Sequence, residues 1–222
     1  MNARRPPRIA PSILAADFAH LGAQVREVVD AGARVIHVDV MDGNFVPPFS
    51  MGPQVCSALR ALDLDIELDV HLMVERPERH VADFASAGAS NITIHAEATP
   101  HVDYALQQIR ELGCTAGLAV CPATPLDIYR EVVVDLALCM TVNPGWGGQA
   151  FIPTSLHKIA RMRALLRDGP ELEVDGGIDA TTAGPAAEVG ATLFVAGSAI
   201  FGADDPAAAY TEIAAAAGCS QP

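Results

Sequence analysis

Basic residues are scarce in this chain of 222 residues, and lysine is almost absent from it. Lys158 is the only lysine, and 14 Lys and Arg stand against 27 Asp and Glu, which gives a formal net charge of −13. A chain this acidic has little electrostatic attraction to nucleic acid or to an anionic membrane, so we expect neither as a partner. Schiff-base chemistry is disfavoured too, since Lys158 falls in a predicted helix and not at the end of a strand.

Paired cysteines and long apolar runs are also missing. The five cysteines are odd in number, and no two of them form a C-x-x-C motif, which argues against a disulfide framework and a zinc knuckle. No segment reaches the roughly 18 uninterrupted apolar residues that a membrane helix needs. The start, MNARRPPR, lacks the apolar segment of a signal peptide. We therefore expect a soluble, cytoplasmic protein.

Short β-branched runs alternate with longer segments of helical spacing along the chain. Hydrophobic residues make up 50% of it and charged residues 18%, a composition typical of a folded domain. Strands are predicted over 8–14, 34–40, 65–72, 91–95, 115–120, 136–142, 172–175 and 192–196. Helices are predicted over 18–31, 52–62, 77–87, 101–112, 154–166, 180–189 and 206–216, with a short connector over 126–132. No linker interrupts the alternation, so residues 1–222 are expected to form one domain.

The number of these units predicts the architecture. Eight β-α units share 222 residues, so the average length of a unit is close to the minimum for a right-handed crossover, which is about 30 residues. We therefore expect an α/β fold, a single (β/α)8 or TIM barrel. The alternative is a doubly wound open sheet, but no glycine-rich dinucleotide turn follows the first strand.

Polar side chains recur on one face of the second and third strands. Side chains alternate across a strand, so residues two apart share a face. These sets are His37, Asp39 and Met41 on the second strand and Asp69, His71 and Met73 on the third. Buried imidazoles and carboxylates need partners, either one another or a shared metal ion. Two adjacent strands with a histidine each favour the ion, and Asp69, one pleat deeper, is expected to orient a histidine.

The seventh strand adds a carboxylate, Asp175, at the same rim of the barrel. Together with His37, Asp39 and His71 it would complete a site with two nitrogen and two oxygen donors. Such mixed donors suit zinc, ferrous iron, manganese or cobalt, and the donor types do not choose among them.

Glycine-rich turns follow the last three strands. Their residues are Gly145, Trp146, Gly147 and Gly148, then Gly176 and Gly177, then Gly197 and Ser198. Glycines let backbone N–H groups approach an anion, and barrel phosphate sites favour the loops after the last strands. These segments lack Lys and Arg, so a phosphorylated substrate would be bound through amide dipoles and the Ser198 hydroxyl, unless the glycines serve only as turns. Trp146 is expected to cover the mouth of the site.

Other residues near the strand ends have less specific roles. Met41, Met73 and Met140 are expected to fill gaps in the core, with a second role open to them: shielding a charged intermediate from water. His95 and Glu97 share a face of the fourth strand and are interpreted as polar packing of the barrel.

Six motifs, in this order, are similar to those of a known family. They are APSIL at 10–14, HVDVMDG at 37–43, HLMV at 71–74, VNPG at 142–145, VDGGI at 174–178 and VAGSAIF at 195–201. The chain resembles the ribulose-phosphate 3-epimerase family, metal-dependent isomerases of the pentose phosphate and Calvin pathways with a ribulose-phosphate-binding TIM barrel. The resemblance implies interconversion of D-ribulose 5-phosphate and D-xylulose 5-phosphate, and a homo-oligomer.

The resemblance also implies residue roles. The metal ligands would be His37, Asp39, His71 and Asp175, and Asp39 and Asp175 would also be the acid/base pair. The substrate contacts would be Ser12, His71, Gly145, Trp146, Gly147, Gly148, Asp175, Gly176, Gly177, Gly197 and Ser198. Two alternatives stay open: an epimerase of a related ketose phosphate such as allulose 6-phosphate, and a barrel that binds sugar phosphates without catalysis.

Overall fold

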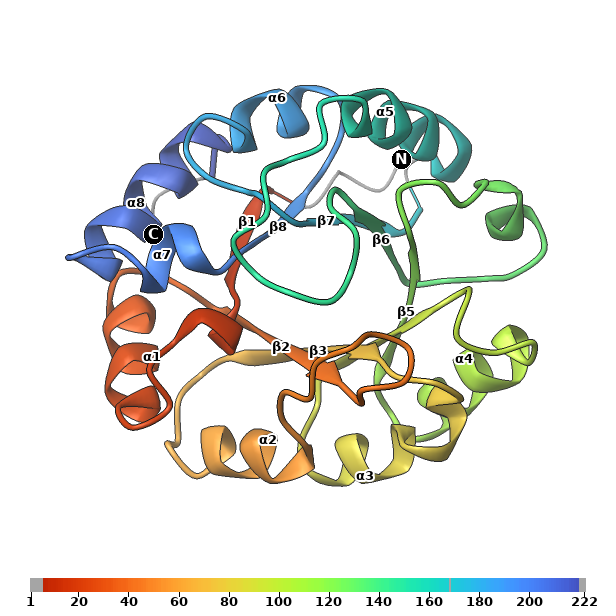
Figure 1. Cartoon of the computed structure of the whole chain (residues 1–222), viewed down its shortest axis with the longest axis horizontal. Helices are drawn as coiled ribbons and strands as arrows, with labels where there is room; N and C mark the ends of the chain where they lie inside the picture. The colour runs from red at the N-terminus through yellow and green to blue at the C-terminus, as the bar shows by residue number, and fades with distance from the viewer. Residues whose placement is uncertain (1–5, 168, 220–222) are drawn as a thin grey trace.

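Eight parallel strands form the centre of the molecule (Figure 1) in a computed structural model that describes residues 6–167 and 169–219. The strands are β1 (Arg8–Pro11), β2 (Val35–Met41), β3 (Glu67–Met73), β4 (Asn91–His95), β5 (Thr115–Val120), β6 (Leu136–Met140), β7 (Glu171–Asp175) and β8 (Leu193–Ala196). Consecutive strands from β2 to β8 are hydrogen-bonded neighbours, and β1 pairs with β8. A single bridge between Ser12 and His37 joins β1 to β2. The predicted (β/α)8 barrel is confirmed.

Helices surround the strands on the outside of the barrel (Figure 1). The α-helices are α1 (Leu21–Asp30), α2 (Pro53–Arg60), α3 (Val81–Ser86), α4 (Val102–Glu111), α5 (Ser155–Leu166), α6 (Ala183–Glu188), α7 (Ser198–Phe201) and α8 (Pro206–Ala216). Three short 3₁₀ helices are η1 (Ile13–Ala15), η2 (Pro77–Arg79) and η3 (Asp127–Arg130). Among the described residues, none of these helices has the length and apolar character needed to cross a membrane.

The structure differs from the predicted boundaries at three places that matter for the site. The first strand ends at Pro11, because the Ser12 hydroxyl accepts a hydrogen bond from the Leu14 N–H and starts η1. The predicted helix over 77–87 is divided into η2 and α3. The segment after β8, predicted only as a glycine turn, contains the short helix α7, a feature of many barrel phosphate sites.

The inner faces of the strands form two kinds of lining. On β5, β6 and β8 the inward side chains are apolar, and Ala119, Leu138 and Val195 belong to one buried cluster. On β2, β3 and β7 the inward side chains are mainly acids and histidines. At the amino ends of the strands, Arg8 closes the barrel with ion pairs to Glu67 at 3.1 Å and Glu171 at 2.9 Å. Polar groups are therefore concentrated on these three strands, of which β7 is separated from β2 by β8 and β1.

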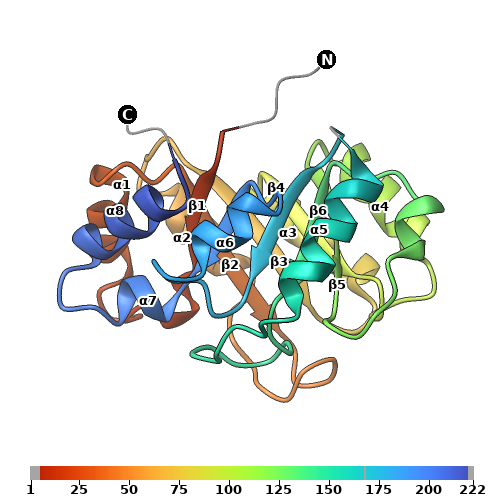
Figure 2. The ribbon, with the colours of Figure 1, turned by 90° about the horizontal axis from the view of Figure 1, so that it is seen from above.

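The loops at the two ends of the barrel differ in size. Figure 2 shows the loops after β2 and β6 projecting beyond the strands at one end of the molecule. These loops follow the carboxyl ends of their strands, which is the end where TIM barrels carry their active sites. We therefore expect the functional site at that end of the barrel.

The inward face of β5 leaves no space for a side chain at Gly117. A Cβ atom there would lie 3.1 Å from Thr93 Cα and would collide with Thr93 Oγ1. We expect Gly117→Ala to lower the free energy of unfolding by about 1–3 kcal/mol, because overpacking forces the neighbouring strands apart. Urea unfolding measures this, with Gly147→Ala as the control, since a Cβ at Gly147 meets nothing within 4 Å. Equal stability of the two variants would contradict the prediction.

Candidate active site

A cavity of about 360 Å³ opens at the carboxyl ends of the strands. It brings together most of the predicted site residues: Ser12, Asp39, Met41, Met73, Met140, Gly145, Trp146, Gly147, Gly148, Asp175, Gly176, Gly177, Gly197 and Ser198. The remaining two, His37 and His71, are fully buried and do not line the cavity. The lining also includes Asn143, Gln149 and Ile178, which the sequence analysis did not single out.

Four side chains from three strands converge at one point beside this cavity. His37 and Asp39 come from β2, His71 from β3 and Asp175 from β7. Asp39 Oδ1 lies 3.3 Å from His37 Nε2 and 3.2 Å from His71 Nδ1. His71 Nδ1 lies 3.6 Å from Asp175 Oδ2, and one donor atom of each residue lies within 4.8 Å of all the others.

The spacing of these donors fits a divalent metal ion. Bonds of about 2.0–2.1 Å to a tetrahedral ion place neighbouring donor atoms about 3.3–3.4 Å apart. The three measured separations, 3.2, 3.3 and 3.6 Å, lie close to that value. Two imidazoles and two carboxylates are also a donor set that first-row divalent metals accept. The cluster can therefore hold a metal ion.

The carboxylate of Asp69, deeper in the barrel, orients His37. His37 Nδ1 lies 2.8 Å from Asp69 Oδ2 and 3.4 Å from Glu173 Oε1, and all three side chains are fully buried. A ligating histidine commonly has its second nitrogen held by a carboxylate in this way. The predicted position of Asp69 below the donors agrees with this contact. Glu173 was missed, although it lies in phase with Asp175 on the seventh strand.

Ser12 makes a structural hydrogen bond besides the substrate contact that the resemblance implies. Its hydroxyl donates to Asp39 Oδ2 at 2.5 Å, and only 4% of the residue is exposed. The bond leaves Asp39 Oδ1 directed at the two histidines. Ser12 thus positions a carboxylate while it also lines the cavity.

The two carboxylates of the cluster differ in their electrostatic surroundings. Burial raises the pKa of Asp39, but the adjacent His37 and His71 outweigh burial and hold that pKa well below its usual range. Burial, followed by the charge of Asp39, raises the pKa of Asp175 to about 7. Two acids with separated pKa values are the arrangement that assigns one group as base and the other as acid. The pair titrates as a unit because the two groups interact.

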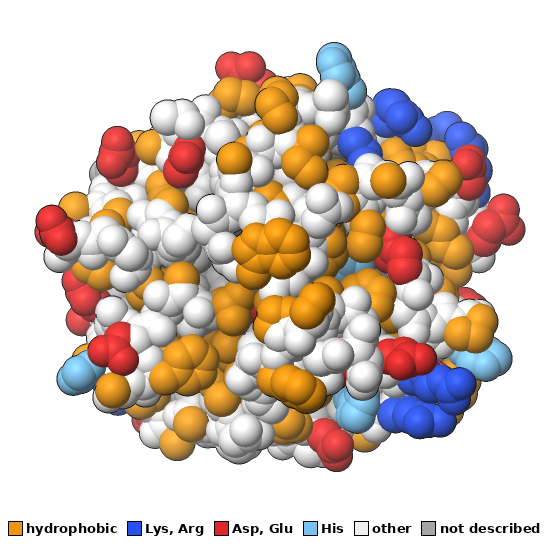
Figure 3. Space-filling model, viewed as in Figure 1, with side chains coloured by type: hydrophobic (Ala, Val, Ile, Leu, Met, Phe, Trp, Pro, Cys, Tyr) orange, Lys and Arg blue, Asp and Glu red, His pale blue; other side chains and the backbone are white. Residues whose placement is uncertain are grey.

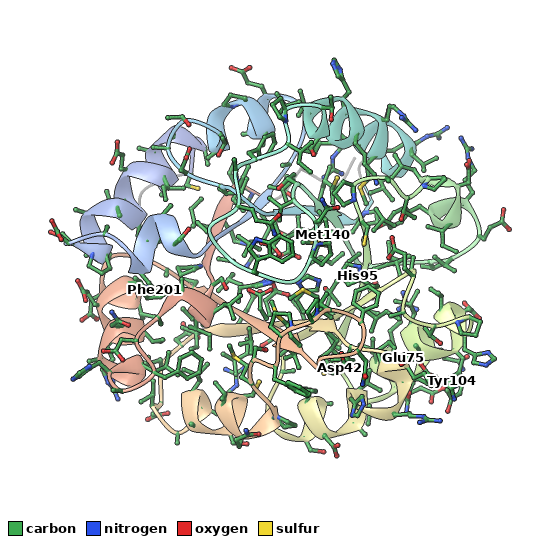
Figure 4. All side chains as sticks on the ribbon, in the orientation of Figure 1. Asp42, Glu75, His95, Tyr104, Met140 and Phe201 are labelled. Atoms are coloured by element: carbon green, nitrogen blue, oxygen red, sulfur yellow. The ribbon has the colours of Figure 1, made fainter. Side chains whose placement is uncertain are left out.

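His95 and Glu97 extend the site outward from His71, which the interpretation as simple barrel packing missed. His71 Nε2 lies 2.8 Å from His95 Nε2, and His95 Nδ1 lies 3.2 Å from Glu97 Oε2. Figure 4 shows His95 and Met140 towards the middle of the barrel. Alternation along the fourth strand placed His95 inward, but no sequence signal paired it with His71.

The loops of the cavity combine an apolar rim with tight glycine turns. Trp146, from the loop after β6, is 57% exposed, and Phe49, from the loop after β2, is 82% exposed. Figure 3 shows hydrophobic side chains gathered near the middle of this face. Gly177 has a φ of +66°, and a Cβ there would lie 2.8 Å from Phe151 Cα, so only glycine fits.

Lys158 takes no part in the cavity. It lies on α5, and its ammonium donates to the carbonyl oxygens of Cys121 at 2.6 Å, Pro122 at 3.1 Å and Thr124 at 2.8 Å. These bonds hold the loop after β5 against α5. The prediction that Lys158 lies on a helix is confirmed.

A parallel barrel with two carboxylates of opposite pKa shift and a metal-capable donor set at the carboxyl ends of its strands has the architecture of a (β/α)8 barrel enzyme. Residues 8–201 match the model of the ribulose-phosphate 3 epimerase family. Ribulose-phosphate 3-epimerase of Serratia marcescens is 50% identical over 202 residues, covering 89% of this chain and 96% of that protein. The enzyme of the same name from Bacillus subtilis (strain 168) is 46% identical over 212 residues, covering 93% and 97%. The chain belongs to the ribulose-phosphate 3-epimerase family, as its motifs indicated.

Solved structures with much lower identity share the fold. KGPDC from Streptococcus mutans in complex with D-R5P has a TM-score of 0.74 at 17% identity, covering 95% of this chain and 97% of that one. 3-Hexulose-6-phosphate synthase from Salmonella typhimurium has a TM-score of 0.73 at 18% identity, covering 95% and 98%. At these identities the likeness supports the barrel architecture and nothing finer.

The Ser12 hydrogen bond predicts a cost in stability. Ser12→Ala leaves Asp39 Oδ2 buried without its hydroxyl donor. We expect the free energy of unfolding to fall by about 1–3 kcal/mol, because an unpaired buried acceptor loses its solvation. Urea unfolding is the measurement, and Ser57→Ala on the exposed face of α2 is the matched control. A loss no larger than that of the control would show that this bond adds nothing to stability.

Proposed function

We propose that the protein interconverts D-ribulose 5-phosphate and D-xylulose 5-phosphate by proton transfer at carbon 3. The observation that carries this proposal is the pair Asp39 and Asp175, two carboxylates with opposite pKa shifts that line one cavity. Inversion at a carbon next to a ketone requires removal of a proton from one face and its return to the other. Two acid/base groups on different sides of a planar enediolate satisfy that requirement.

The positions of the two carboxylates set their roles. Asp39 and Asp175 come from β2 and β7, which are separated by β1 and β8 around the barrel, so they approach a bound substrate from different directions. Asp39, whose pKa is lowered chiefly by the adjacent His37, accepts the carbon 3 proton. Asp175, whose raised pKa of about 7 keeps part of it protonated near neutral pH, donates to the opposite face, and the roles exchange in the reverse reaction.

The donors His37, Asp39, His71 and Asp175 would hold one divalent metal ion per subunit, whether zinc, iron(II), manganese or cobalt. When bound, such an ion supplies Lewis-acid stabilisation of the charge that develops on the substrate oxygens. His71 and His37 would serve as neutral ligands, and Ser12 would keep Asp39 in place.

The glycine loops and the methionines would bind and enclose the sugar phosphate. Gly147, Gly148, Gly176, Gly177, Gly197 and Ser198 line the cavity on its β6 to β8 side. Backbone N–H groups and the Ser198 hydroxyl are the donors these loops would offer to a phosphate, since no Lys or Arg among the described residues lines the cavity. Met41, Met73 and Met140 also line it, and their apolar side chains would keep water from an enediolate.

Further properties of the chain belong to the same proposal. We expect residues 1–222 to act as one domain, in the cytoplasm and as a homo-oligomer, with a phosphorylated ketose as the partner and neither nucleic acid nor membrane. An epimerase of allulose 6-phosphate would use the same four donors, so it stays an alternative. A barrel that only binds sugar phosphates would have no need of two carboxylates with separated pKa values.

Proton NMR of D-ribulose 5-phosphate with the purified protein in deuterium oxide tests the proposed reaction. We expect deuterium to enter carbon 3 as xylulose 5-phosphate forms, to stop on chelation and to resume when a divalent metal is added. The same measurement with allulose 6-phosphate compares the five- and six-carbon substrates. Neither exchange nor product from a folded, metal-loaded sample would refute the pentose reaction.

Removing either acid/base group should abolish most of the turnover. We expect Asp39→Asn and Asp175→Asn each to lower kcat by about 100- to 10,000-fold, because an amide neither accepts nor donates the carbon 3 proton at neutral pH. Coupled-assay kinetics on metal-loaded protein provide the measurement. Asp103→Asn, an exposed substitution on α4, controls for the loss of a negative charge. If either active-site variant keeps near-wild-type turnover, the two-acid scheme is wrong.

The phosphate assignment predicts a selective effect at Gly147. A Cβ there has open space around it in the protein but would enter the proposed phosphate cradle. We expect Gly147→Ala to raise KM for the phosphorylated ketose by about tenfold and to leave the melting temperature of the protein unchanged. The unphosphorylated ketose is the control substrate, and its kcat/KM should not change. An equal loss for both substrates would place the phosphate elsewhere.

A further inference from the structure

A line of hydrogen-bonding groups runs from the donor cluster to the surface. His71 Nε2 contacts His95 Nε2 at 2.8 Å, and His95 Nδ1 contacts Glu97 Oε2 at 3.2 Å. His95 is fully buried, and the ring of Phe45 lies beside it at a centroid distance of 4.8 Å. Burial and this ring contact restrict the orientation of the His95 ring, which the two hydrogen-bonding contacts require.

The outer end of this line is fixed as an acceptor. Glu97 Oε1 accepts hydrogen bonds from the Cys121 N–H at 2.8 Å and from the Thr124 hydroxyl. Burial raises the pKa of Glu97, but the hydrogen bonds from His95, Thr124 and Cys121 outweigh burial and lower it to about 2. An ionised carboxylate has no proton to donate, so Glu97 Oε2 must accept from His95 Nδ1.

Counting protons along the line determines the tautomer of His71. A neutral imidazole carries one N–H, so His95, with its proton on Nδ1, presents a lone pair at Nε2. The contact with His71 then requires the His71 proton on Nε2. His71 Nδ1 is left with a lone pair, and this is the atom that faces Asp39 and Asp175.

We propose that Glu97, acting through His95, is a positioning residue that locks His71 in the metal-binding tautomer. In the opposite tautomer an Nδ1–H would point at Asp39 Oδ1, where it would form a good hydrogen bond and exclude a cation. Glu97 and His95 therefore oppose the His71 tautomer with its proton on Nδ1, which the buried carboxylate of Asp39 would otherwise favour. The inference rests on the proposed function, in which His71 is a metal ligand.

The competing explanation for the arrangement of His95 and Glu97 is that they bind a cation outside the cavity. His95, Glu97 and Cys121 could themselves hold a metal, with Cys121 Sγ at 3.7 Å from His95 Nδ1. That arrangement needs a lone pair on His95 Nδ1. The His95 proton would then lie on Nε2 and be donated to His71 Nε2, which would place the His71 proton on Nδ1. It would also bring a cation beside Lys158, whose ammonium lies 2.6 Å from the Cys121 carbonyl oxygen.

Glu97→Gln is the decisive variant because it should reverse the direction of the hydrogen bonds from residue 97 through His95 to His71 without changing the shape of the side chain. The amide oxygen must take the Oε1 position, since the Cys121 N–H there needs an acceptor. The amide NH₂ then faces His95 Nδ1 and donates to it. His95 would carry its proton on Nε2, and His71 would carry its proton on Nδ1.

Two measurements read this reversal. Nitrogen-15 NMR of metal-free protein should show the His71 proton on Nε2 in the wild type and on Nδ1 in Glu97→Gln. Titration with Mn²⁺ against a chelator should show affinity lower by about 10- to 100-fold in the variant, the usual effect of losing an outer carboxylate partner. Glu75→Gln, which removes an exposed carboxylate just after β3 on the same rim (Figure 4), should change neither.

A second variant keeps the test decisive if Glu97→Gln does not fold. His95→Phe retains a ring next to Phe45 and removes the acceptor for His71 Nε2, so the same loss of Mn²⁺ affinity is expected. Unchanged His71 tautomer and affinity in a folded variant would overturn the inference. A second equivalent of Zn²⁺ that binds the wild type but not Cys121→Ser would also overturn it. His71→Ala tests the proposed ligand set separately, since undiminished Mn²⁺ affinity there would refute that set.

Discussion

The burial of ionisable groups inside the barrel is the constraint on which the rest of the structure depends. Carboxylates and imidazoles are costly to remove from water unless each has a partner, and β2, β3 and β7 place several of them on the inner face. Arg8 compensates Glu67 and Glu171 at the amino ends of the strands, and Asp69 holds His37 in the middle. Towards the carboxyl ends the compensation is incomplete, because Asp39 and Asp175 lie together beside two histidines. That deficit of positive charge is what a metal ion would supply.

The unequal compensation of the two carboxylates underlies the chemistry proposed for the cavity. Asp39 receives a hydrogen bond from Ser12 and lies against both histidines, whereas Asp175 lies near the charge of Asp39 with less compensation. The pKa of Asp39 is lowered and that of Asp175 is raised to about 7, so the two carboxylates differ in proton affinity, as proton exchange between two faces of a substrate requires. The glycine loops after β6, β7 and β8, to which substrate binding is assigned, line the same cavity as these carboxylates. Backbone amides in those loops would let an acidic protein bind an anionic substrate without Lys or Arg.

Local sequence pattern was sufficient for much of this. The alternation of short apolar strands and helical segments predicted the barrel, and the two-residue period of a strand predicted which side chains of β2 and β3 share a face. It also placed His95 inward, but it assigned that histidine to packing. Helix α7 and the early end of β1 were missed, because a capping serine and a one-turn helix leave no periodic signal. Glu173 was overlooked for a different reason, since a lone acid in an apolar strand gives no indication of its partners.

The sequence by itself determined the order of the motifs along the chain, the four candidate donors and the scarcity of cations near them, because these depend on residue type and period alone. Only the tertiary structure decided which atoms meet. The register between β2 and β3 sets Asp39 beside His71, and that between β3 and β4 brings His71 within reach of His95. Register and side-chain rotamer depend on the packing of the whole barrel, not on any one strand. The tautomer that His71 adopts is therefore a property of contacts between strands that no single segment of the chain encodes.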